Sequence, residues 1–411
     1  MAPGPRLPEK GTHVKRLVVI GAGYAGSCVA RMFRGRFDVL VLEADSMPGG
    51  LCKSYYRDGL VYEYGPHILA NHNCSEEAIA FLRSHVDTVD TKVTSASFVR
   101  DRTTWYPVHR RNAALLGLEA EVEAELRALP ATPRMDNFET YLVDRVGRTL
   151  YEIYFADFTR KFWGVDPASL SADWARTRHL GESLDAEEMF FNRSWCAYPR
   201  GDWNDLFRNL LKETRVVYDA AVARVLPEER CVVLRAGPRV EYDLLLSTAS
   251  IDFLFDHRLG KLTYRGYEIE PRVVDRPAWA TFNGKPVSMT YYPEATVPYT
   301  RITDYGSFQR KEECPTYRGR TIVTVETPSA SSELYPSTDR ESLQLFDRYI
   351  RLASRYPEIV TFGRKGLYKY LTTDTATEMA LRLGDHLFSW EALSNEARYA
   401  AYQEIRGSWN N

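Results

Sequence analysis

The chain has 411 residues, with 53 basic and 55 acidic side chains and a net charge of −2. This length is enough for about two or three domains, and a hydrophobic content of 44% is too high for a disordered chain. Near-neutral charge argues against a dedicated nucleic-acid surface, and no apolar run approaches the roughly 20 residues needed to cross a bilayer. We therefore expect a globular protein that binds neither nucleic acid nor membrane.

The six cysteines are widely scattered, and no two of them form a CxxC pair. That pattern indicates neither a zinc knuckle nor a disulfide framework, so we expect no bound metal. The N-terminus lacks the apolar segment of a signal peptide. Together these features favour the reducing cytoplasm. They leave the oligomeric state open, a homodimer included.

Residues 1–13 are rich in proline and glycine and predict a loose tail. The apolar run 16–20 then predicts a buried parallel strand that ends at Gly21. Residues 24–35 carry apolar side chains at helical spacing, and residues 37–43 predict a second strand. A strand, a helix and a strand in such close succession are typical of an α/β domain.

The rest of the chain mixes helices with strands. Apolar periodicity predicts helices at 76–90, 113–129, 138–159, 338–355 and 374–383. Short apolar or alternating runs predict strands at 216–218, 231–234 and 243–247, a strand-rich region over 262–327, and a hairpin over 98–108.

A glycine motif stands between the first strand and the first helix. Gly21, Gly23 and Gly26 form GxGxxG, in which the glycines permit a tight turn, a close approach of backbone to a pyrophosphate, and packing of the helix on the strand. The helix N-terminus then faces the anion. Glu43 ends the second strand, where a carboxylate can accept from ribose hydroxyls. The segment therefore predicts a dinucleotide site.

The residues after Glu43 favour one dinucleotide. Met47 to Leu51 contains the pair Gly49-Gly50, and an acid followed by such a pair resembles the FAD-binding class of amine oxidases and their relatives. The segment 242–249 resembles the strand that returns to the cofactor domain in that class. The resemblance favours FAD over NAD. No cysteine or histidine stands in an obvious flavin-attachment motif, so we expect noncovalent FAD.

Four further segments resemble the UDP-galactopyranose mutase family. In chain order they are Gly65-Pro66-His67-Ile68, Phe158 to Gly164, Val297-Pro298-Tyr299-Thr300-Arg301-Ile302, and Gly363-Arg364 to Tyr370. The resemblance runs from about residue 15 to about residue 385. Its most specific piece is the Val-Pro-Tyr-Thr-Arg run.

The resemblance implies a flavin-dependent isomerase that interconverts the pyranose and furanose forms of a nucleoside-diphosphate sugar. In the family, reduced FAD attacks the anomeric carbon through N5, displaces the nucleoside diphosphate and forms a covalent flavin–sugar adduct. The ring opens and recloses before the diphosphate returns. The substrate would be UDP-galactose or a related sugar nucleotide, and the reductant would be NADPH, NADH or another donor.

The resemblance also implies which residues form the site. Two arginines would stabilise the departing diphosphate, because a guanidinium meets phosphate oxygens in pairs; they are Arg301 and Arg178, with Arg176 as the alternative to Arg178. His67 would lie against the flavin as a third catalytic residue. The cofactor-binding residues would be Gly21, Gly23, Gly26, Glu43, Gly49, Gly50, Leu51, Val217 and Arg364. The substrate-binding residues would be Phe158, Trp163, Arg178, Phe190, Tyr299, Arg301, Tyr335 and Tyr370.

The chain departs from the family pattern in several places. Leu69-Ala70 stand where the family has Phe-His, Thr372 where it has Asp, Ser95 where an Asn is expected, and Phe158 where many members have Tyr. Each change removes a polar group or shortens a side chain, and an unpaired polar group on a bound substrate costs roughly 1–3 kcal/mol. A deoxy sugar or a different base is therefore a candidate.

Two alternative functions share the fold and the glycine motifs. One is an FAD-dependent oxidase or desaturase of the amine-oxidase class, which would have no use for two diphosphate-binding arginines. The other is a non-catalytic FAD-binding homologue. Arg301 and Tyr370 argue against the second alternative, while Ala70 and Thr372 argue mildly for it.

We expect an α/β protein made of three units, each assembled from separated parts of the chain. They are a doubly wound, Rossmann-like FAD-binding domain, a helical insert, and a mostly antiparallel sheet domain that binds substrate. The expected boundaries are 14–75, 200–252 and 356–390 for the FAD domain, 76–91 and 109–165 for the helical insert, 92–108, 166–199 and 253–355 for the sheet domain, and 1–13 and 396–411 for loose tails.

Overall fold

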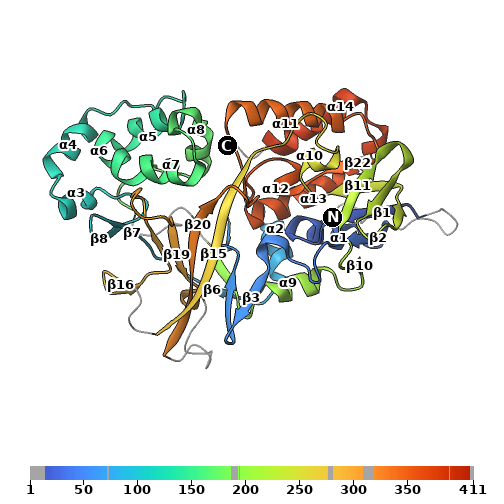
Figure 1. Cartoon of the computed structure of the whole chain (residues 1–411), viewed down its shortest axis with the longest axis horizontal. Helices are drawn as coiled ribbons and strands as arrows, with labels where there is room; N and C mark the ends of the chain where they lie inside the picture. The colour runs from blue at the N-terminus through green and yellow to red at the C-terminus, as the bar shows by residue number, and fades with distance from the viewer. Residues whose placement is uncertain are drawn as a thin grey trace.

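The computed structural model describes residues 14–71, 74–186, 193, 195–275, 281–308, 319–387 and 389–407. Figure 1 shows a helical lobe on the left and an α/β lobe on the right, with the long strands β15 (Tyr264–Asp275) and β20 (Arg320–Ser329) running between them. The expected N-terminal tail and Phe190 lie outside the described residues.

The α/β lobe is built on a five-stranded parallel sheet in the order β10-β2-β1-β14-β22. Its strands are β1 (Arg16–Ile20), β2 (Asp38–Leu42), β10 (Arg215–Val217), β14 (Leu244–Ser247) and β22 (Ile359–Thr361). The apolar side chains of the three central strands are buried, as in parallel sheets covered on both faces. The expected Rossmann-like fold is confirmed.

Helices of the α/β lobe pack in two groups. The helix α1 (Tyr24–Phe33) follows the glycine motif and contacts α9 (Trp203–Leu210) and α13 (Thr373–Leu387). The helix α11 (Arg340–Ala353) contacts β22, α10 (Ile251–Leu254) and α14 (Asn395–Gly407). The short helix α12 (Gly363–Gly366) leads from β22 back toward α1.

The second large sheet has seven strands in the order β21-β15-β20-β19-β18-β7-β8. Adjacent strands of this sheet pair antiparallel, except β18 and β7, which are parallel. The expected mostly antiparallel sheet is therefore confirmed. The hairpin β7–β8 covers residues 95–105 and so overlaps the hairpin expected over 98–108. The shorter strands are β7 (Ser95–Val99), β8 (Arg102–Trp105), β18 (Met289–Tyr291), β19 (Arg301–Asp304) and β21 (Tyr335–Pro336).

Within the described residues, four small sheets contain the remaining strands. They are β3 (Ser54–Arg57) with β4 (Leu60–Glu63); β5 (Leu69–Ala70), β9 (Cys196–Pro199) and β6 (Thr88–Asp90); β11 (Val222–Leu226), β12 (Cys231–Leu234) and β13 (Arg239–Glu241); and β16 (Thr281–Phe282) with β17 (Lys285–Pro286).

The helical lobe consists of shorter helices than the periodicity predicts. The helix expected over 138–159 is interrupted at Gly147, whose φ of 84° is outside the helical region, and again by a π-helical turn over Glu152–Ala156. The helix expected over 113–129 is interrupted at Gly117. The helices are α3 (Arg111–Leu116), α4 (Glu119–Arg127), α5 (Phe138–Val146), α6 (Arg148–Tyr151), α7 (Asp157–Trp163) and α8 (Ala172–Thr177).

Tertiary packing corrects several expected boundaries. Residues 76–91 do not join the helical insert, because α2 (Glu76–Arg83) packs against α13 and β6 pairs with β9. The helices α8 and α11 do not join the sheet domain, because α8 packs against α5 and α11 against β22. The expected tail 396–411 is wrong for its described part: residues 395–407 form α14, which buries Tyr402 and Ile405.

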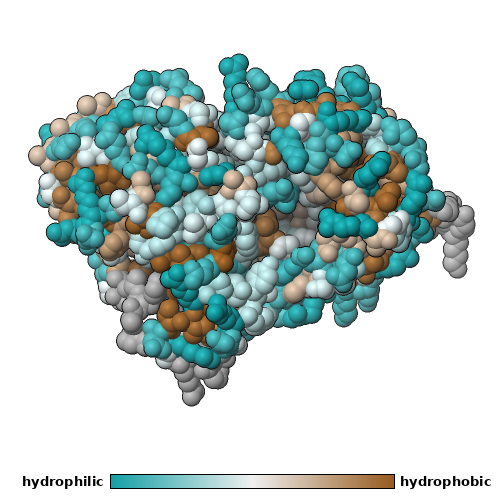
Figure 2. Space-filling view, in the orientation of Figure 1, coloured by the Kyte–Doolittle hydropathy of each residue, from teal (hydrophilic) through white to brown (hydrophobic). Residues whose placement is uncertain are grey.

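Hydrophilic side chains cover much of the outer helical surface, and the surface is notched between the two lobes (Figure 2). Within the described residues, none of the helices combines the length and the apolar character needed to span a membrane.

Candidate active site

The glycine motif wraps tightly around the end of β1. A Cβ at Gly26 would lie 2.0 Å from the carbonyl oxygen of Gly21, so only glycine lets α1 pack this closely on the turn. Glu43 stabilises the same turn from the end of β2, where its Oε2 accepts from the Ala22 N–H at 2.6 Å and its Oε1 from the Asp45 N–H at 2.9 Å.

The second glycine pair packs on the first motif. The Gly49 N–H donates to Ala22 O at 2.9 Å, and Gly50, at φ +53°, is so close to Gly23 that an added Cβ would lie 3.1 Å from the Gly23 Cα. Two segments that are separate in the sequence therefore form one continuous backbone cradle.

This cradle lines a cavity of about 660 Å³, which we call the cofactor groove. Gly21, Gly23, Glu43, Gly50 and Leu51 line it directly, and α1 begins beside it, so backbone N–H groups face the groove. The volume is in the range of small-molecule and cofactor sites. Because added Cβ atoms would crowd this backbone, the residues present fit a bound dinucleotide.

His67 lines the cofactor groove and is held by a buried acid. Its Nδ1 and its backbone N–H lie 3.1 Å and 3.0 Å from Glu63 Oε2, and the Tyr198 hydroxyl donates to the same carboxylate. Burial by itself would lower the pKa of His67, but Cys52 and Glu63 together raise it to about 10. Burial raises the pKa of Glu63 as well.

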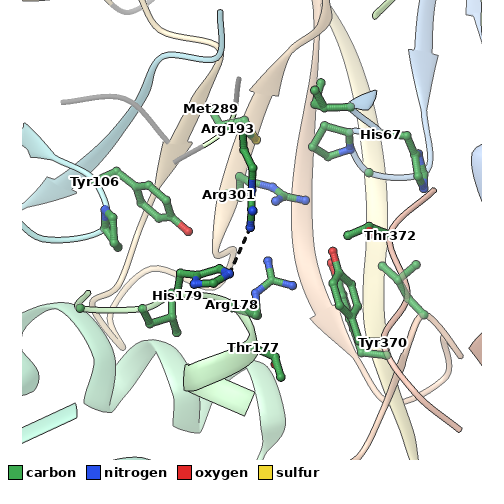
Figure 3. A pocket seen from close by; sticks show the side chains of 18 of the residues that line it. His67, Tyr106, Thr177, Arg178, His179, Arg193, Met289, Arg301, Tyr370 and Thr372 are labelled. Atoms are coloured by element: carbon green, nitrogen blue, oxygen red, sulfur yellow. Dashed lines mark hydrogen bonds between the residues drawn. The ribbon is translucent and has the colours of Figure 1, made fainter. Parts of the chain in front are cut away.

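A second cavity, of about 190 Å³, adjoins the groove; we call it the arginine cavity. His67, Arg364, Tyr370 and Thr372 line both cavities. In Figure 3, Arg178 and Arg301 extend toward the middle of the arginine cavity, with Tyr106 on one side and Tyr370 on the other. The first of these arginines comes from the helical lobe and the second from the antiparallel sheet.

Arg301 begins β19 and is directly opposite Glu326 in the register with β20. Its Nε donates to Glu326 Oε2 at 2.9 Å, and one Nη donates to the Tyr291 hydroxyl at 3.2 Å. Thr303 Oγ1 donates to the other carboxylate oxygen at 2.6 Å. Although burial disfavours the charge, Glu326 keeps the pKa of Arg301 well above its usual value.

Arg178 follows the last turn of α8 and lies between two rings, 5.1 Å from the centroid of Trp174 and 4.8 Å from that of Tyr370. No carboxylate of the described residues pairs with it, and one of its Nη atoms is buried without a hydrogen-bond partner. Arg176 instead pairs with Asp173 at 3.1 Å on an exposed part of the helix. Of the two sequence candidates, the structure therefore brings Arg178 into the cavity.

Two stacked tyrosines form one wall of the arginine cavity. The rings of Tyr335 and Tyr370 are 5.5 Å apart at an interplanar angle of 23°, and Arg364 covers the Tyr370 ring at 4.8 Å while donating to the carbonyl of Leu371 at 2.8 Å. Burial would raise the pKa of Tyr370, but Arg178 and Arg364 bring it below its usual value. The cavity thus presents hydroxyls beside concentrated positive charge.

Phe158 and Trp163 line a small aromatic annex of about 80 Å³, which also contacts Arg178 and Arg301. Trp163 packs edge-on against Trp174 at 5.1 Å. The annex brings the walls of the helical lobe and the antiparallel sheet together beside the arginines.

Other predicted site residues lie outside these cavities. Val217 is 41% exposed at the sheet edge, its carbonyl accepts from the Glu43 N–H, and it is not among the residues that line the groove. Tyr299 packs against Tyr292 beyond the cavity wall. Ala70 and Ser95 are buried in strands and line none of the three cavities.

Sequence reasoning missed Tyr106, Tyr291 and Glu326. The rings of Tyr106 and Tyr291 stack at 3.8 Å and line the aromatic annex. Glu326 had a local signal, since a carboxylate stands at the end of the apolar run 321–325 in a buried strand. The partner of that carboxylate depends on strand register, which the pattern does not contain.

Two family models match this chain. The family model described as UDP-galactopyranose mutase matches residues 153–370, and the model described as an NAD(P)-binding Rossmann-like domain matches residues 19–84. The first match spans the helices, strands and loops that carry both arginines.

Individual relatives cover nearly the whole chain. A probable UDP-galactopyranose mutase of Klebsiella pneumoniae is 23% identical over 93% of this chain and 97% of its own. A dTDP-fucopyranose mutase of Escherichia coli is also 23% identical, over 90% and 97%. A solved structure of reduced UDP-galactopyranose mutase matches with a TM-score of 0.76, at 16% identity over 96% of this chain and 99% of that one.

Proposed function

Because the chain belongs to the UDP-galactopyranose mutase family, we propose that it is a flavin-dependent isomerase that interconverts the pyranose and furanose forms of a nucleoside-diphosphate sugar. The observation that carries the proposal is the meeting of Arg178 and Arg301, from different lobes, in a cavity that adjoins the cofactor groove. Two cations in one buried cavity suit a diphosphate.

The cofactor of the proposed reaction is FAD, held by the glycine cradle and Glu43 with Arg364 at the junction of the two cavities. When bound and reduced, FAD would supply the nucleophilic N5, which would hold the anomeric carbon while the diphosphate is detached. His67, whose pKa Cys52 and Glu63 raise to about 10 against the effect of burial, offers positive charge at the same junction.

Arg178 and Arg301 stabilise the charge that grows on the diphosphate as it leaves. Donors that are fixed in advance in a water-poor site need no rearrangement at that moment. The hydroxyls of Tyr335 and Tyr370 line the same cavity and add hydrogen bonds to the phosphate oxygens. The same groups keep the diphosphate in place for its return to the anomeric carbon.

The proposed substrate is UDP-galactose or a related sugar nucleotide, including a deoxy sugar or a different base. Thr372, in place of an acid, lines the junction where the sugar would sit, and its hydroxyl lies 2.8 Å from Thr375 Oγ1. A shorter, uncharged side chain there suits a sugar with fewer polar groups. The equal similarity to a dTDP-fucopyranose mutase supports including that sugar.

The experiment is turnover of a sugar-nucleotide panel by the purified protein loaded with FAD. UDP-galactopyranose, UDP-galactofuranose and dTDP-fucopyranose are incubated with enzyme reduced by dithionite, NADPH or NADH, and the products are separated by chromatography. We expect interconversion only with reduced enzyme and no stoichiometric consumption of reductant.

Absence of interconversion throughout the panel, with FAD bound and reduced, would contradict the proposal. Oxygen consumption with release of peroxide on amine substrates would favour the oxidase alternative instead. Oxidised enzyme serves as the matched control, because only the redox state of the cofactor differs.

A further inference from the structure

The ammonium group of Lys161 is enclosed by the backbone of a single loop. Lys161 lies on α7 in the helical lobe. Its Nζ donates toward four carbonyl oxygens, those of Tyr292 at 2.7 Å, Glu294 at 2.9 Å, Val297 at 2.8 Å and Tyr299 at 2.9 Å. All four acceptors belong to the loop between β18 and β19. We call this loop, residues 292–299, the carbonyl loop.

The carbonyl loop needs a cation at its centre. Its own described backbone bonds include Tyr292 N–H to Thr300 O at 2.9 Å and Val297 N–H to Glu294 O at 3.2 Å. Four carbonyl dipoles that converge on one point repel each other unless positive charge lies there. An ammonium has three N–H donors and no acceptor, so it can serve the four carbonyls when two of them share one N–H.

Burial lowers the pKa of Lys161 to about 8, while Asp157 and Glu294 act to raise it. The amine is therefore mainly charged at neutral pH. The neighbouring ring of Tyr299 packs edge-on against Tyr292 at 4.8 Å, so the loop closes around the ammonium group from both ends.

The carbonyl loop leads directly into the active site. Tyr299 and Thr300 are followed by Arg301, the first residue of β19. Pro293 of the loop lines the aromatic annex together with Phe158, which lies three residues before Lys161 on α7. Two of the segments that resemble the mutase family, one around Lys161 and one around Arg301, thus contact each other in space.

We propose that Lys161 is a positioning residue that fastens the carbonyl loop of the sheet to α7 and thereby fixes Arg301 opposite Arg178. The ammonium acts as a structural cation inside a ring of backbone oxygens. It does not contact the arginine cavity itself, since Lys161 is not among the residues that line it. The catalytic consequence rests on the proposed function, whereas the cation requirement does not.

The test removes the cation and then supplies it from solution. Lys161→Ala deletes three carbons and the ammonium, and propylammonium replaces the deleted group, whereas 1-propanol replaces its shape without its charge. The holoenzyme variant is measured by thermal unfolding, by binding of UDP and dTDP, and by turnover. Arg160→Ala is the matched control, because Arg160 is the preceding residue on α7 and its side chain forms an exposed pair with Asp157.

We expect Lys161→Ala to retain FAD, since the substituted residue lies outside the cofactor groove. It should lose turnover by on the order of 10²-fold through misplacement of Arg301, with weaker binding of nucleoside diphosphate. Propylammonium, and K⁺ at high concentration, should raise the melting temperature of the variant and recover part of the diphosphate binding. The wild type, Arg160→Ala and the 1-propanol arm should show no such gain.

Equal responses of Lys161→Ala and Arg160→Ala, or rescue by 1-propanol as strong as by propylammonium, would overturn the proposal. Thermal shifts and diphosphate binding can be read even if no sugar in the panel turns over, so failure of the proposed function is distinguishable. If Lys161→Ala does not fold, Lys161→Gln, which keeps two N–H donors, is measured in the same way. Lys161→Gln with wild-type stability and diphosphate binding would then overturn the proposal.

Discussion

Arg301 and Arg178 face one cavity, yet the sheet and the helical lobe hold them in opposite ways. In the sheet, Arg301 is fixed by a fully buried carboxylate, a hydroxyl and a cross-strand register. In the helical lobe, Arg178 rests between aromatic rings and has a buried nitrogen without a partner. One charge is neutralised before any ligand arrives, and the other is not.

This difference suggests different roles for the two arginines: Arg301 is held in a fixed position, and Arg178 is available to bind a ligand. Glu326 offsets the cost of burying Arg301 and fixes the direction of its guanidinium. Arg178 keeps unused hydrogen-bonding capacity for an incoming anion, and its aromatic neighbours stabilise it only modestly. We therefore expect substitutions at the two arginines to have similar effects on turnover and different effects on stability.

Arg301→Ala should have the largest effect, because it affects both properties. Turnover should fall by about 10²–10³-fold, the usual result of losing one donor to a developing charge. The free energy of unfolding should fall by about 3–5 kcal/mol, since Glu326 would remain buried without its partner. Turnover assays and denaturant unfolding measure the two effects.

A double variant tests the cause of that instability. Arg301→Met combined with Glu326→Leu should recover most of the unfolding free energy, because hydrophobic residues can replace a buried pair, but it should not recover turnover. If Arg301→Ala alone is as stable as wild type, the buried pair has no structural role.

Arg178→Ala should lose turnover by about 10²–10³-fold while its unfolding free energy stays within about 1 kcal/mol of wild type. The exposed neighbour Arg176 provides the matched control, since surface pairs such as Arg176–Asp173 contribute about 0–1 kcal/mol. Arg176→Ala should therefore be nearly normal in both assays. If Arg176→Ala were inactive and Arg178→Ala active, the diphosphate-binding role would belong to Arg176 instead of Arg178.

Binding of a nucleoside diphosphate sharpens the comparison. At about 100 times its Kd, such a ligand should stabilise the wild type by about 2.7 kcal/mol through mass action. At the same ligand concentration Arg178→Ala should show much less stabilisation, because the variant lacks the guanidinium whose unpaired donor would bind the anion. An unchanged thermal shift in Arg178→Ala would place the anion elsewhere.

The smallest expected effect concerns the buried pair of His67 and Glu63. It is a change of unfolding free energy with pH. A His67 pKa of about 10 in the folded protein, against about 6.5 in the unfolded chain, means that the folded state binds more protons between these values. The stabilising contribution of His67 is therefore complete below about pH 6.5 and is lost as the pH rises through about 10.

Unfolding free energies of the wild type and His67→Gln should accordingly differ most at and below about pH 6.5 and converge as the pH rises toward about 10. The difference should be moderate, because the buried carboxylate of Glu63 is itself costly and its pKa is raised. A difference that is constant across this range would show that His67 does not titrate with Glu63.

Sequence alone determined the parts of this protein that depend on backbone chemistry and local pattern. Gly21, Gly23, Gly26 and the pair at 49–50 predicted the cofactor cradle, because close backbone contacts exclude a side chain. Apolar runs predicted the parallel strands. The specific segments around Phe158 and Arg301 indicated the family, which the matching model confirmed.

Only the tertiary structure decided how these parts meet. The pairing of Arg301 with Glu326 follows from cross-strand register, and the enclosure of Lys161 requires a loop more than a hundred residues away in the chain. The exposure of Val217 and its place outside the lining of the cofactor groove follow from its strand being the sheet edge. A residue pattern reports which side chains are available, whereas burial, charge pairing and the direction of a carbonyl are set by neighbours that the chain brings together only on folding.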